Sequence, residues 1–290
     1  MKRCVSCDRI LAGEGWRCAG CGFEPEAHES WLRMAPGWTK AGYEDDFFEQ
    51  LVHCEPGHFW FEGRNRIIQW ALRKFAPSPT NFLEVGCGTG FVLRGIGEAF
   101  PGIRLVGGEL FEAGLPFART RVPHAELYQM DALNIPFVEE FDAVGAFDVI
   151  EHIPDDATAL QQMRRSLKPG GIAIISVPQH AWLWTAIDDF SHHQRRYTRR
   201  MLRERLIAAG LVPILMTSFV SLLLPLMLAS RLRAPKTAAQ VDLHTEFRIP
   251  AFVNRILNFV MRVELRGLKA GLRYPAGGSL LAVARRPAEK

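Results

Sequence analysis

The sequence predicts an α/β fold in which helices cover both faces of an open sheet, and three observations support this. The apolar run Phe82–Val85 leads directly into a glycine-rich turn. A second apolar run ends at Glu109, about 20 residues later, which is the spacing of the ribose-binding acid in dinucleotide-binding folds. A further run, Phe141–Phe147, is followed by Asp148. Polar groups at successive strand ends predict a ligand site at that edge of the sheet.

Composition permits this fold and limits the function. A chain of 290 residues that is 48% hydrophobic can bury one sizeable core and carry a small appendage. The formal net charge of +4, without a concentrated basic stripe, is too mild to indicate nucleic acid and by itself leaves the partner undecided; we do not expect nucleic acid as the partner. Residues 1–15 contain charged side chains and no apolar signal core, so we expect a cytoplasmic protein.

Two Cys-x-x-Cys pairs lie at the start of the chain, ten residues apart. Each pair can present two thiolates from one tight turn, and together they supply the four sulfurs of a closed tetrahedral site. Disulfides and a redox pair are the alternatives. We expect a zinc ribbon over residues 1–26 whose zinc is structural, since no coordination position is left open. Its ligands are Cys4, Cys7, Cys18 and Cys21.

Residues 27–80 are expected to form a linker and helices that close on the site. Ile67, Trp70 and Ala71 fall on one helical face, which predicts the helix before the first strand.

The glycines of the turn allow the backbone to approach a ligand closely. Gly86, Gly88 and Gly90 stand at alternate positions, but such a motif could be only a tight connection. A dehydrogenase would carry Gly-x-Gly-x-x-Gly, and this chain has Phe91 at the last position of that fingerprint. The motif therefore disfavours a dehydrogenase.

From the glycine loop through residues 167–171 and 174–178, the chain resembles a class I S-adenosylmethionine-dependent methyltransferase. The resemblance implies a Rossmann-like seven-stranded sheet with helices on both faces. It implies that the glycine loop holds the methionine part of the cofactor, that Glu109 binds the ribose, and that Asp131 and Ala132 lie at the adenine. The resemblance also implies that Arg64 pairs with the cofactor carboxylate beside two aromatic rings, although ordinary packing explains such clusters equally well. The candidate cofactor residues are Phe59, Trp60, Arg64, Glu84, Gly86, Cys87, Gly88, Gly90, Glu109, Leu110, Asp131, Ala132 and Phe147.

The first catalytic candidates follow the fourth strand. Methyl transfer needs alignment of donor and acceptor, and a base only where the acceptor is protonated. His152 could remove the proton of a hydroxyl acceptor, with Glu151 beside it. The pattern Asp148-x-x-Glu151-His152 is also similar to a signature of ubiquinone-pathway O-methyltransferases that is linked there to magnesium, which makes magnesium possible here. A helix cap is the structural alternative.

A second polar cluster follows the fifth strand and suits an acceptor lid. It contains His180 and His192, which complete the catalytic candidates, and also Asp188 and Tyr197. The neighbouring His192 and His193 point in different directions on a helix or a strand, so we expect acceptor recognition rather than a metal shared between them. Thr198 is the predicted N-cap of a helix to Gly210.

Residues 211–230 carry no charge and are long enough for a membrane span. The fold requires a strand at 210–217, which leaves an apolar helix over 220–230, interrupted by Pro225. We expect an insertion at about 220–275 that covers the acceptor or touches a membrane surface, because Arg231, Arg233 and Lys236 follow the apolar helix. A solvated face is the alternative. Residues 277–285 resemble the last strand of the methyltransferase family.

These observations predict a zinc ribbon joined to a methyltransferase domain over residues 81–290. The expected reaction is O-methylation of a small-molecule or lipid-linked acceptor. Two other classes stay open: a methyltransferase whose ribbon recruits a protein or nucleic acid, and a non-catalytic scaffold that binds the cofactor. The absence of an Asn-Pro-Pro-Tyr-like tetrad after the fourth strand counts against methylation of amino groups in bases or glutamine.

Overall fold

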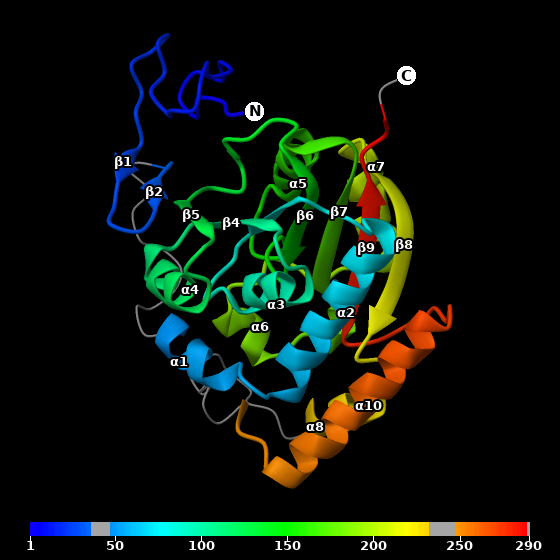
Figure 1. Ribbon diagram of the computed structural model, residues 1–290. Helices are drawn as coiled ribbons and strands as arrows, with labels where there is room; N and C mark the ends of the chain where they lie inside the picture. Colours follow the sequence, from blue (N-terminus) through cyan, green and yellow to red (C-terminus); the bar gives the residue numbers. More distant parts are fainter. Residues whose placement is uncertain (36–46, 232–246, 289–290) are drawn as a thin grey trace.

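The computed structural model describes residues 1–35, 47–231 and 247–288. Its centre is a nine-stranded sheet with the order β1-β2-β5-β4-β3-β6-β7-β9-β8 (Figure 1). The strands are β1 (Glu26–Ala27), β2 (Leu32–Arg33), β3 (Asn81–Val85), β4 (Arg104–Glu109), β5 (Glu126–Gln129), β6 (Phe141–Phe147), β7 (Leu167–Pro178), β8 (Val212–Phe219) and β9 (Ser279–Arg285).

The seven strands from β3 to β9 confirm the predicted Rossmann-like sheet. Strands β3 to β7 are parallel, and β9 lies antiparallel between β7 and β8. The chain order of the strands reverses beside β3, so the carboxyl ends of β3, β4 and β6 meet where such folds bind ligands. The two short strands β1 and β2 were not predicted. They extend the edge at β5, where Leu32 pairs with Tyr128.

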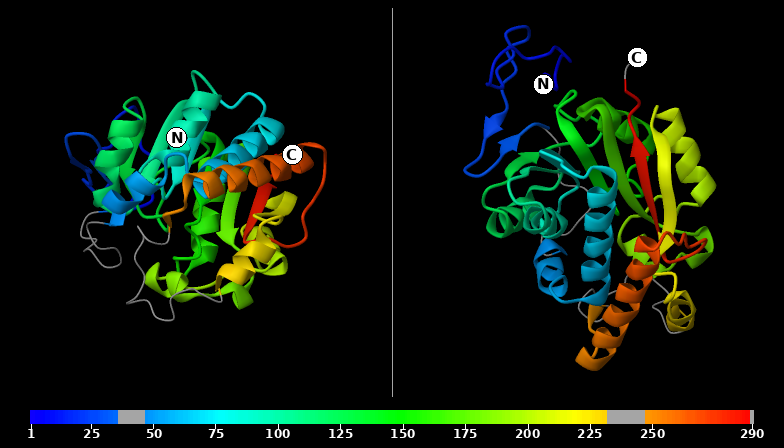
Figure 2. Two further views of the ribbon diagram at one scale, coloured as in Figure 1. Left: turned by 90° about the horizontal axis from the view of Figure 1, so that it is seen from below. Right: turned by 45° about the vertical axis from the view of Figure 1, so that its right-hand side comes forward.

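Helices cover both faces of the sheet (Figure 2). One buried core includes apolar side chains of α2, α3, α4 and α10, and the other includes those of α5 and α7. The helices are α1 (Phe47–Cys54), α2 (Phe59–Phe75), α3 (Phe91–Ala99), α4 (Leu115–Arg121), α5 (Asp156–Ser166), α6 (Ala186–Phe190), α7 (Arg199–Ala208), α8 (Leu224–Arg231) and α10 (Ala251–Lys269).

Side-chain caps explain where several helices begin. Asp155 accepts a hydrogen bond from the backbone N–H of Thr158 at the start of α5, at 3.0 Å. Thr198 accepts one from the N–H of Met201 at 3.1 Å, which confirms the predicted cap of α7. The predicted helix through Ile67 is α2.

The region after α7 differs from the prediction in one respect. Strand β8 (Val212–Phe219) occupies the first half of the uncharged run 211–230, where a strand was expected. Pro225 does not interrupt the following helix, because α8 begins at Leu224 and a proline is tolerated in the first helical turn, where its missing N–H has no intrahelical partner. In the part of the chain that the structure describes, no helix has the length and hydropathy of a membrane span. Arg233 and Lys236 lie outside the described residues.

The cysteine-containing segment packs against the residues that precede β6 and against α5. Arg3 is buried there, and its Nε donates to the carbonyl oxygen of Ile135 at 2.8 Å. Its Nη2 donates to Asn134 and Gln162, each at 2.7 Å. Trp16 meets the ring of Phe137 edge to face, with centroids 5.7 Å apart. The N-terminus therefore lies at the end of the sheet opposite the expected ligand edge (Figure 1).

Candidate functional site

The glycine loop connects β3 to α3 at the carboxyl edge of the sheet. Gly86 and Gly90 have φ angles of +71° and +75°, which side-chain-bearing residues rarely adopt. A Cβ atom at Gly90 would also lie 2.9 Å from Cα of Ala118. The loop therefore needs glycine for its backbone conformation and for the close approach of α4.

Glu109 ends β4 and turns its carboxylate into this loop. One oxygen accepts from the N–H of Gly88 at 2.8 Å, and the other accepts from the N–H of Phe111 at 3.0 Å. Burial raises the pKa of Glu109 above its usual value, although these two N–H donors act to lower it. The structure thus brings together the glycines and the acid that the sequence spacing paired.

Two buried polar groups at this edge have unsatisfied atoms. Glu84 of β3 is buried, and its Oε2 has no hydrogen-bond partner among the described residues. Arg64 of α2 forms an ion pair with Asp148, and its guanidinium lies 4.5 Å from the ring of Trp60. The Nε of Arg64 has no partner among the residues that the structure covers. Burial raises the pKa of Glu84 well above its usual value. Binding of a ligand that forms hydrogen bonds with these unsatisfied groups would therefore be favourable at this edge.

The other predicted cofactor residues occupy different parts of the edge. Asp131 follows β5 and accepts from the N–H of Leu133 at 2.8 Å. The backbone N–H of Phe59 donates to Asn254 of α10 at 2.8 Å. The remaining candidates lie at or just beyond the ends of β3, β4, β5 and β6: Cys87, Leu110, Ala132 and Phe147.

Sequence reasoning missed a buried ionic cluster that holds the glycine loop. Glu55, just after α1, accepts from the hydroxyl of Thr89 at 2.8 and 2.7 Å and forms an ion pair with Arg121 of α4. Thr89 lies within the loop, so two other segments, the one after α1 and α4, hold the loop in place. No pattern within the sequence links these segments, and only the fold brings them together.

Beyond β6, the structure gathers Glu151, His152 and His193. One potential ligand atom from each residue lies within 4.8 Å of the others. Glu151 is fully buried, and neither of its oxygens has a hydrogen-bond partner within the described ranges. The rings of His152 and His193 meet edge to face, with centroids 4.7 Å apart. We predicted Glu151 and His152 from the sequence, whereas His193 was not among the catalytic candidates.

His193 is held by a buried carboxylate. Its Nδ1 lies 2.8 Å from an oxygen of Asp188, which also pairs with Arg196 at 2.7 Å. The N–H of Thr185 donates to the second carboxylate oxygen at 2.7 Å. Burial acts to raise the pKa of Asp188, but the hydrogen bonds from His193 and Arg196 hold it well below its usual value. Asp188 is therefore an ionised group that fixes the ring of His193.

The two other predicted catalytic histidines make different contacts. His180 stacks on Trp182, with ring centroids 4.9 Å apart, and its backbone N–H donates to Tyr197 at 3.0 Å. His192 is exposed and has a φ of +55°. Neither belongs to the group of Glu151, His152 and His193.

Asp148 also stays outside that group. Its carboxylate pairs with Arg64 and accepts from the hydroxyl of Ser176 at 3.3 Å. The three-residue magnesium set suggested by the sequence, Asp148 with Glu151 and His152, is not gathered among the described residues. Magnesium at this set therefore has no support from the geometry.

The four N-terminal cysteines form a second compact cluster. Sγ of Cys4 lies 3.5 Å from Sγ of Cys21, and Sγ of Cys7 lies 3.6 Å from that of Cys18. All four sulfurs lie within 4.8 Å of one another. A tetrahedron with metal–sulfur bonds of about 2.3 Å places its sulfurs about 3.8 Å apart, so these residues fit a four-sulfur metal site. Hydrogen bonds from the backbone of Cys21 and Gly20 lower the pKa of Cys18 to about 6.

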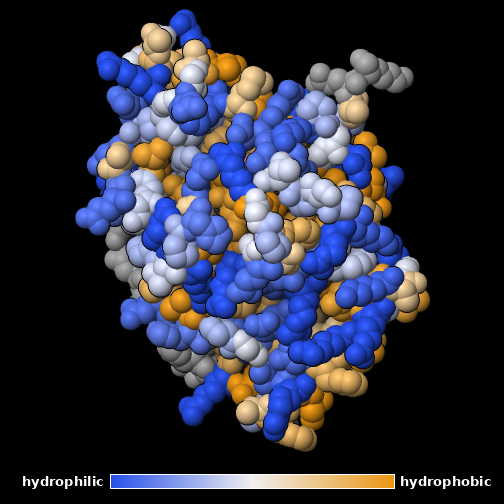
Figure 3. Space-filling model, in the orientation of Figure 1, coloured by the Kyte–Doolittle hydropathy of each residue, from blue (hydrophilic) through white to orange (hydrophobic). Residues whose placement is uncertain are grey.

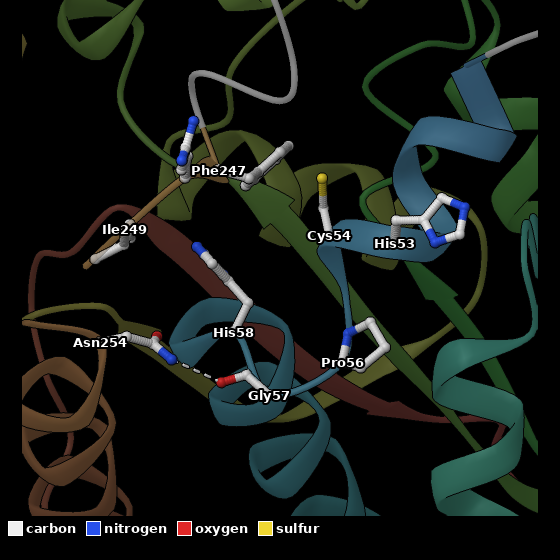
Figure 4. A pocket seen from close by; sticks show the side chains of 9 residues that line it. His53, Cys54, Pro56, Gly57, His58, Phe247, Ile249 and Asn254 are labelled. Carbon is white, nitrogen blue, oxygen red and sulfur yellow. Dashed lines mark hydrogen bonds between the residues drawn. The ribbon is translucent and has the colours of Figure 1, made fainter. Parts of the chain in front are cut away.

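A pocket with a volume of about 620 Å³ is lined by none of the residues of these clusters (Figure 4). The segment between α1 and α2 forms one side, and the segment leading into α10 forms the other. Asn254 joins the two sides by donating to the carbonyl oxygen of Gly57 at 2.9 Å. The residues lining it are His53, Cys54, Pro56, Gly57, His58, Phe247, Arg248, Ile249 and Asn254.

Comparison with known proteins agrees with the geometry. Residues 83–175 match the family described as a methyltransferase domain. A "probable S-adenosylmethionine-dependent methyltransferase" of Mycolicibacterium smegmatis is 28% identical over 158 residues, which are 53% of this chain and 59% of the relative. The malonyl-[acyl-carrier protein] O-methyltransferase of Methylococcus capsulatus is 28% identical over 202 residues, covering 66% of this chain and 70% of that protein. The chain thus spans less than two thirds of its mycobacterial relatives.

The fold is shared with a solved structure, the phosphoethanolamine N-methyltransferase 2 of Haemonchus contortus in complex with S-adenosyl-L-methionine. The TM-score is 0.56 at 19% identity, with 84% of this chain and 58% of that chain covered. At this identity the likeness concerns the fold alone.

Proposed function

This chain contains a class I S-adenosylmethionine-dependent methyltransferase domain, and we propose that it transfers the methyl group to an oxygen of a small-molecule or lipid-linked acceptor. The observation that carries this proposal is the pairing of Glu109 with the glycine loop at the carboxyl edge of the sheet. Relatives of this chain include proteins named as O-methyltransferases, which supports oxygen as the methylated atom.

The residues at the edge fit the cofactor, which supplies an activated methyl group on a sulfonium when bound. Glu109 would accept hydrogen bonds from the ribose hydroxyls, as an acid at this position does in related sheets. Arg64, with a buried and unsatisfied Nε, would pair with the carboxylate of the methionine part. Asp131 lies beyond β5 and would meet the adenine amino group. The roles of the other edge residues predicted from the sequence, among them Phe59 and Trp60, belong to the same proposal.

Glu151 and His152 are the proposed groups that act on the acceptor. They follow β6, at the edge where an acceptor would meet the sulfonium. A methyl transfer is an in-line substitution, so the site must align the two reactants and free the acceptor oxygen of its proton. His180 and His192 remain candidates for recognising the acceptor.

The insertion at about 220–275 is proposed to cover the acceptor together with the region before α2. The 620 Å³ pocket supports this, because both segments line it (Figure 4). A substitution of Asn254 by alanine would remove the hydrogen bond between them and should raise the KM for the acceptor more than the affinity for the cofactor.

A lipid-linked acceptor is favoured by the outer face of α10. Phe252, Ile256, Phe259 and Val263 follow helical spacing and are exposed, with Phe252 66% exposed. Arginines interleave with them along the same helix, and Figure 3 shows hydrophobic side chains beside hydrophilic ones at this end of the molecule. An apolar stripe with cations suits an anionic lipid surface.

Vesicle sedimentation tests the lipid surface. The chain should sediment with vesicles that contain anionic lipid and not with purely zwitterionic ones, and Phe252→Asp/Phe259→Asp should abolish sedimentation. Leu272→Asp, an exposed leucine beyond α10, is the matched control. Equal sedimentation of all three proteins would contradict the proposal.

We also propose that residues 1–26 form a zinc ribbon. The support is the sulfur spacing, which fits a tetrahedral four-cysteine site. Such a site has no open position, so its zinc would stabilise the segment rather than take part in the reaction.

Calorimetric titration with S-adenosylmethionine, and separately with NAD, tests the cofactor. Binding of S-adenosylmethionine alone is expected. Glu109→Ala should weaken it by about 10- to 100-fold, because hydrogen bonds to a charged group contribute about 1.5–3 kcal/mol. Glu98→Ala, which removes an exposed carboxylate on α3, is the control. Binding of neither ligand would refute the cofactor assignment, and tight binding without turnover on any acceptor would favour a scaffold.

A further inference from the structure

Glu151 is the buried group that the fold leaves least satisfied at the ligand edge. Its side chain has no exposed surface, and both carboxylate oxygens lack hydrogen-bond partners among the described residues. Burying a carboxylate in this way is costly unless a positive partner compensates it. The potential ligand atoms nearest to it in this cluster are imidazole nitrogens, with Nε2 of His152 4.0 Å away.

The second histidine is oriented as metal-ligating histidines usually are. Nδ1 of His193 is engaged by the carboxylate of Asp188 at 2.8 Å, which leaves Nε2 as the nitrogen available to the cluster. Arg196 and the Thr185 capping box fix that carboxylate in turn. A ligand histidine backed by a carboxylate has a fixed ring and a more basic nitrogen.

We infer that Glu151, His152 and His193 form a binding site for a divalent transition-metal ion such as Zn²⁺. Two imidazoles and one carboxylate are a ligand set that zinc takes in catalytic sites, where a fourth position stays open for water or substrate. Magnesium is disfavoured, since it prefers oxygen ligands. The three ligand atoms lie within 4.8 Å of one another, close enough to surround one ion after small rotamer adjustments.

The role of this ion rests on the proposed O-methylation. The open position would take the acceptor hydroxyl, and the cation would lower the pKa of that hydroxyl. The O–H bond breaks and the proton passes to solvent. The acceptor oxygen then forms a bond to the methyl carbon while the carbon–sulfur bond breaks and leaves its electron pair on sulfur. The oxidation state of the metal ion does not change, so no oxidant or reductant is required.

Metal content tests the site independently of activity. The full chain is stripped with a chelator, reloaded with zinc, desalted and analysed by atomic emission. With both sites filled, wild type should retain about two zinc ions per chain, and His193→Ala and Glu151→Gln about one each. Cys7→Ser/Cys21→Ser should also retain about one. His124→Ala, an exposed histidine outside both clusters, should retain the wild-type content.

Cobalt spectra of the wild type identify both sites without relying on the folding of a variant. Cobalt in wild type should show thiolate charge-transfer bands from the cysteine cluster and visible bands from the second site. Only the visible bands from the second site should remain in Cys7→Ser/Cys21→Ser. One zinc ion in wild type that is lost entirely with the cysteine variant would overturn the inference, and so would an unchanged zinc content in His193→Ala. Titration with S-adenosylmethionine after stripping separates this result from the cofactor assignment, because none of Glu151, His152 and His193 is proposed to hold the cofactor.

Discussion

Two side-chain clusters in this chain can each surround a metal ion, and they differ in almost every other respect. The cysteine cluster lies at the amino end of the sheet, comes from one short segment and offers four sulfurs. The cluster of Glu151, His152 and His193 lies beyond the carboxyl end of β6, comes from two loops, and offers two nitrogens and one carboxylate. The first set would close around its ion, whereas the second would leave room for a substrate. We therefore expect the cluster at the amino end of the sheet to stabilise the fold and the cluster at the carboxyl end to act on a ligand.

The largest effect is expected from removing metal from the cysteine cluster. The small buried group around it holds only Cys4, Leu11 and Cys18, with two partly buried aromatic neighbours, so the metal should supply most of its folding energy. In Cys18→Ser we expect hydrogen exchange in residues 1–25 to rise by about 10³-fold or more. Strands β3 to β7 should keep their protection. Cys54→Ser is the control, and unchanged exchange in the variant would show that docking alone folds the segment.

Substitutions in the cluster of Glu151, His152 and His193 should lower the turnover number rather than the stability of the fold. His193→Ala should lower kcat by about 10²-fold, the order expected when a group that activates the acceptor is lost, with cofactor affinity unchanged. His124→Ala should retain wild-type turnover. A wild-type kcat in the His193 variant would remove the functional difference between the two clusters.

Asp188 sharpens the comparison, because only the second cluster has a buried carboxylate behind one of its ligands. Asp188→Asn should weaken zinc binding at that cluster by about 10- to 100-fold, as loss of a supporting carboxylate typically does. Zinc at the cysteines should be unaffected. Asp189→Asn changes the neighbouring exposed carboxylate and is the matched control. Competition with a coloured zinc chelator measures both affinities, and equal affinities in the two variants would contradict the role of Asp188.

The smallest effect concerns the pH dependence of cofactor binding, which should be independent of both clusters. Glu109 must be ionised to accept hydrogen bonds from the ribose, and burial raises its pKa above the usual 4.5. Affinity should therefore be complete above the raised pKa and fall by up to about tenfold per pH unit below it. Glu109→Gln should flatten the profile, while Cys7→Ser/Cys21→Ser should not. A profile that moves with the cysteines would show that the two ends of the molecule are coupled.

The elements that the sequence predicted are those with local causes. Strand β3 and its glycine turn, the cap at Thr198 and the grouping of four cysteines each depend on residues close together in the chain. The predicted interruption at Pro225 was wrong because the sequence did not show that α8 begins one residue earlier, at Leu224.

What the sequence could not predict depends on contacts between distant segments. His193 reaches Glu151 because β7 and the loop that follows it return the chain to the same edge as β6. Glu55 supports the glycine loop from 34 residues before Thr89. The short strands β1 and β2 have too few residues to show a period, and they form because the edge of β5 is available to pair.

The place of β9 in the sheet also sets the order in which the chain can assemble during synthesis. Ser279–Arg285 pairs with β7 on one side and β8 on the other, yet it leaves the ribosome after both of them and after α10. Until then β7 and β8 each present an unpaired edge, and α10 has no completed sheet beneath it. Open strand edges and apolar helix faces invite aggregation. We therefore expect the nascent chain to need chaperone protection late in its translation, when most of the methyltransferase domain has already been made.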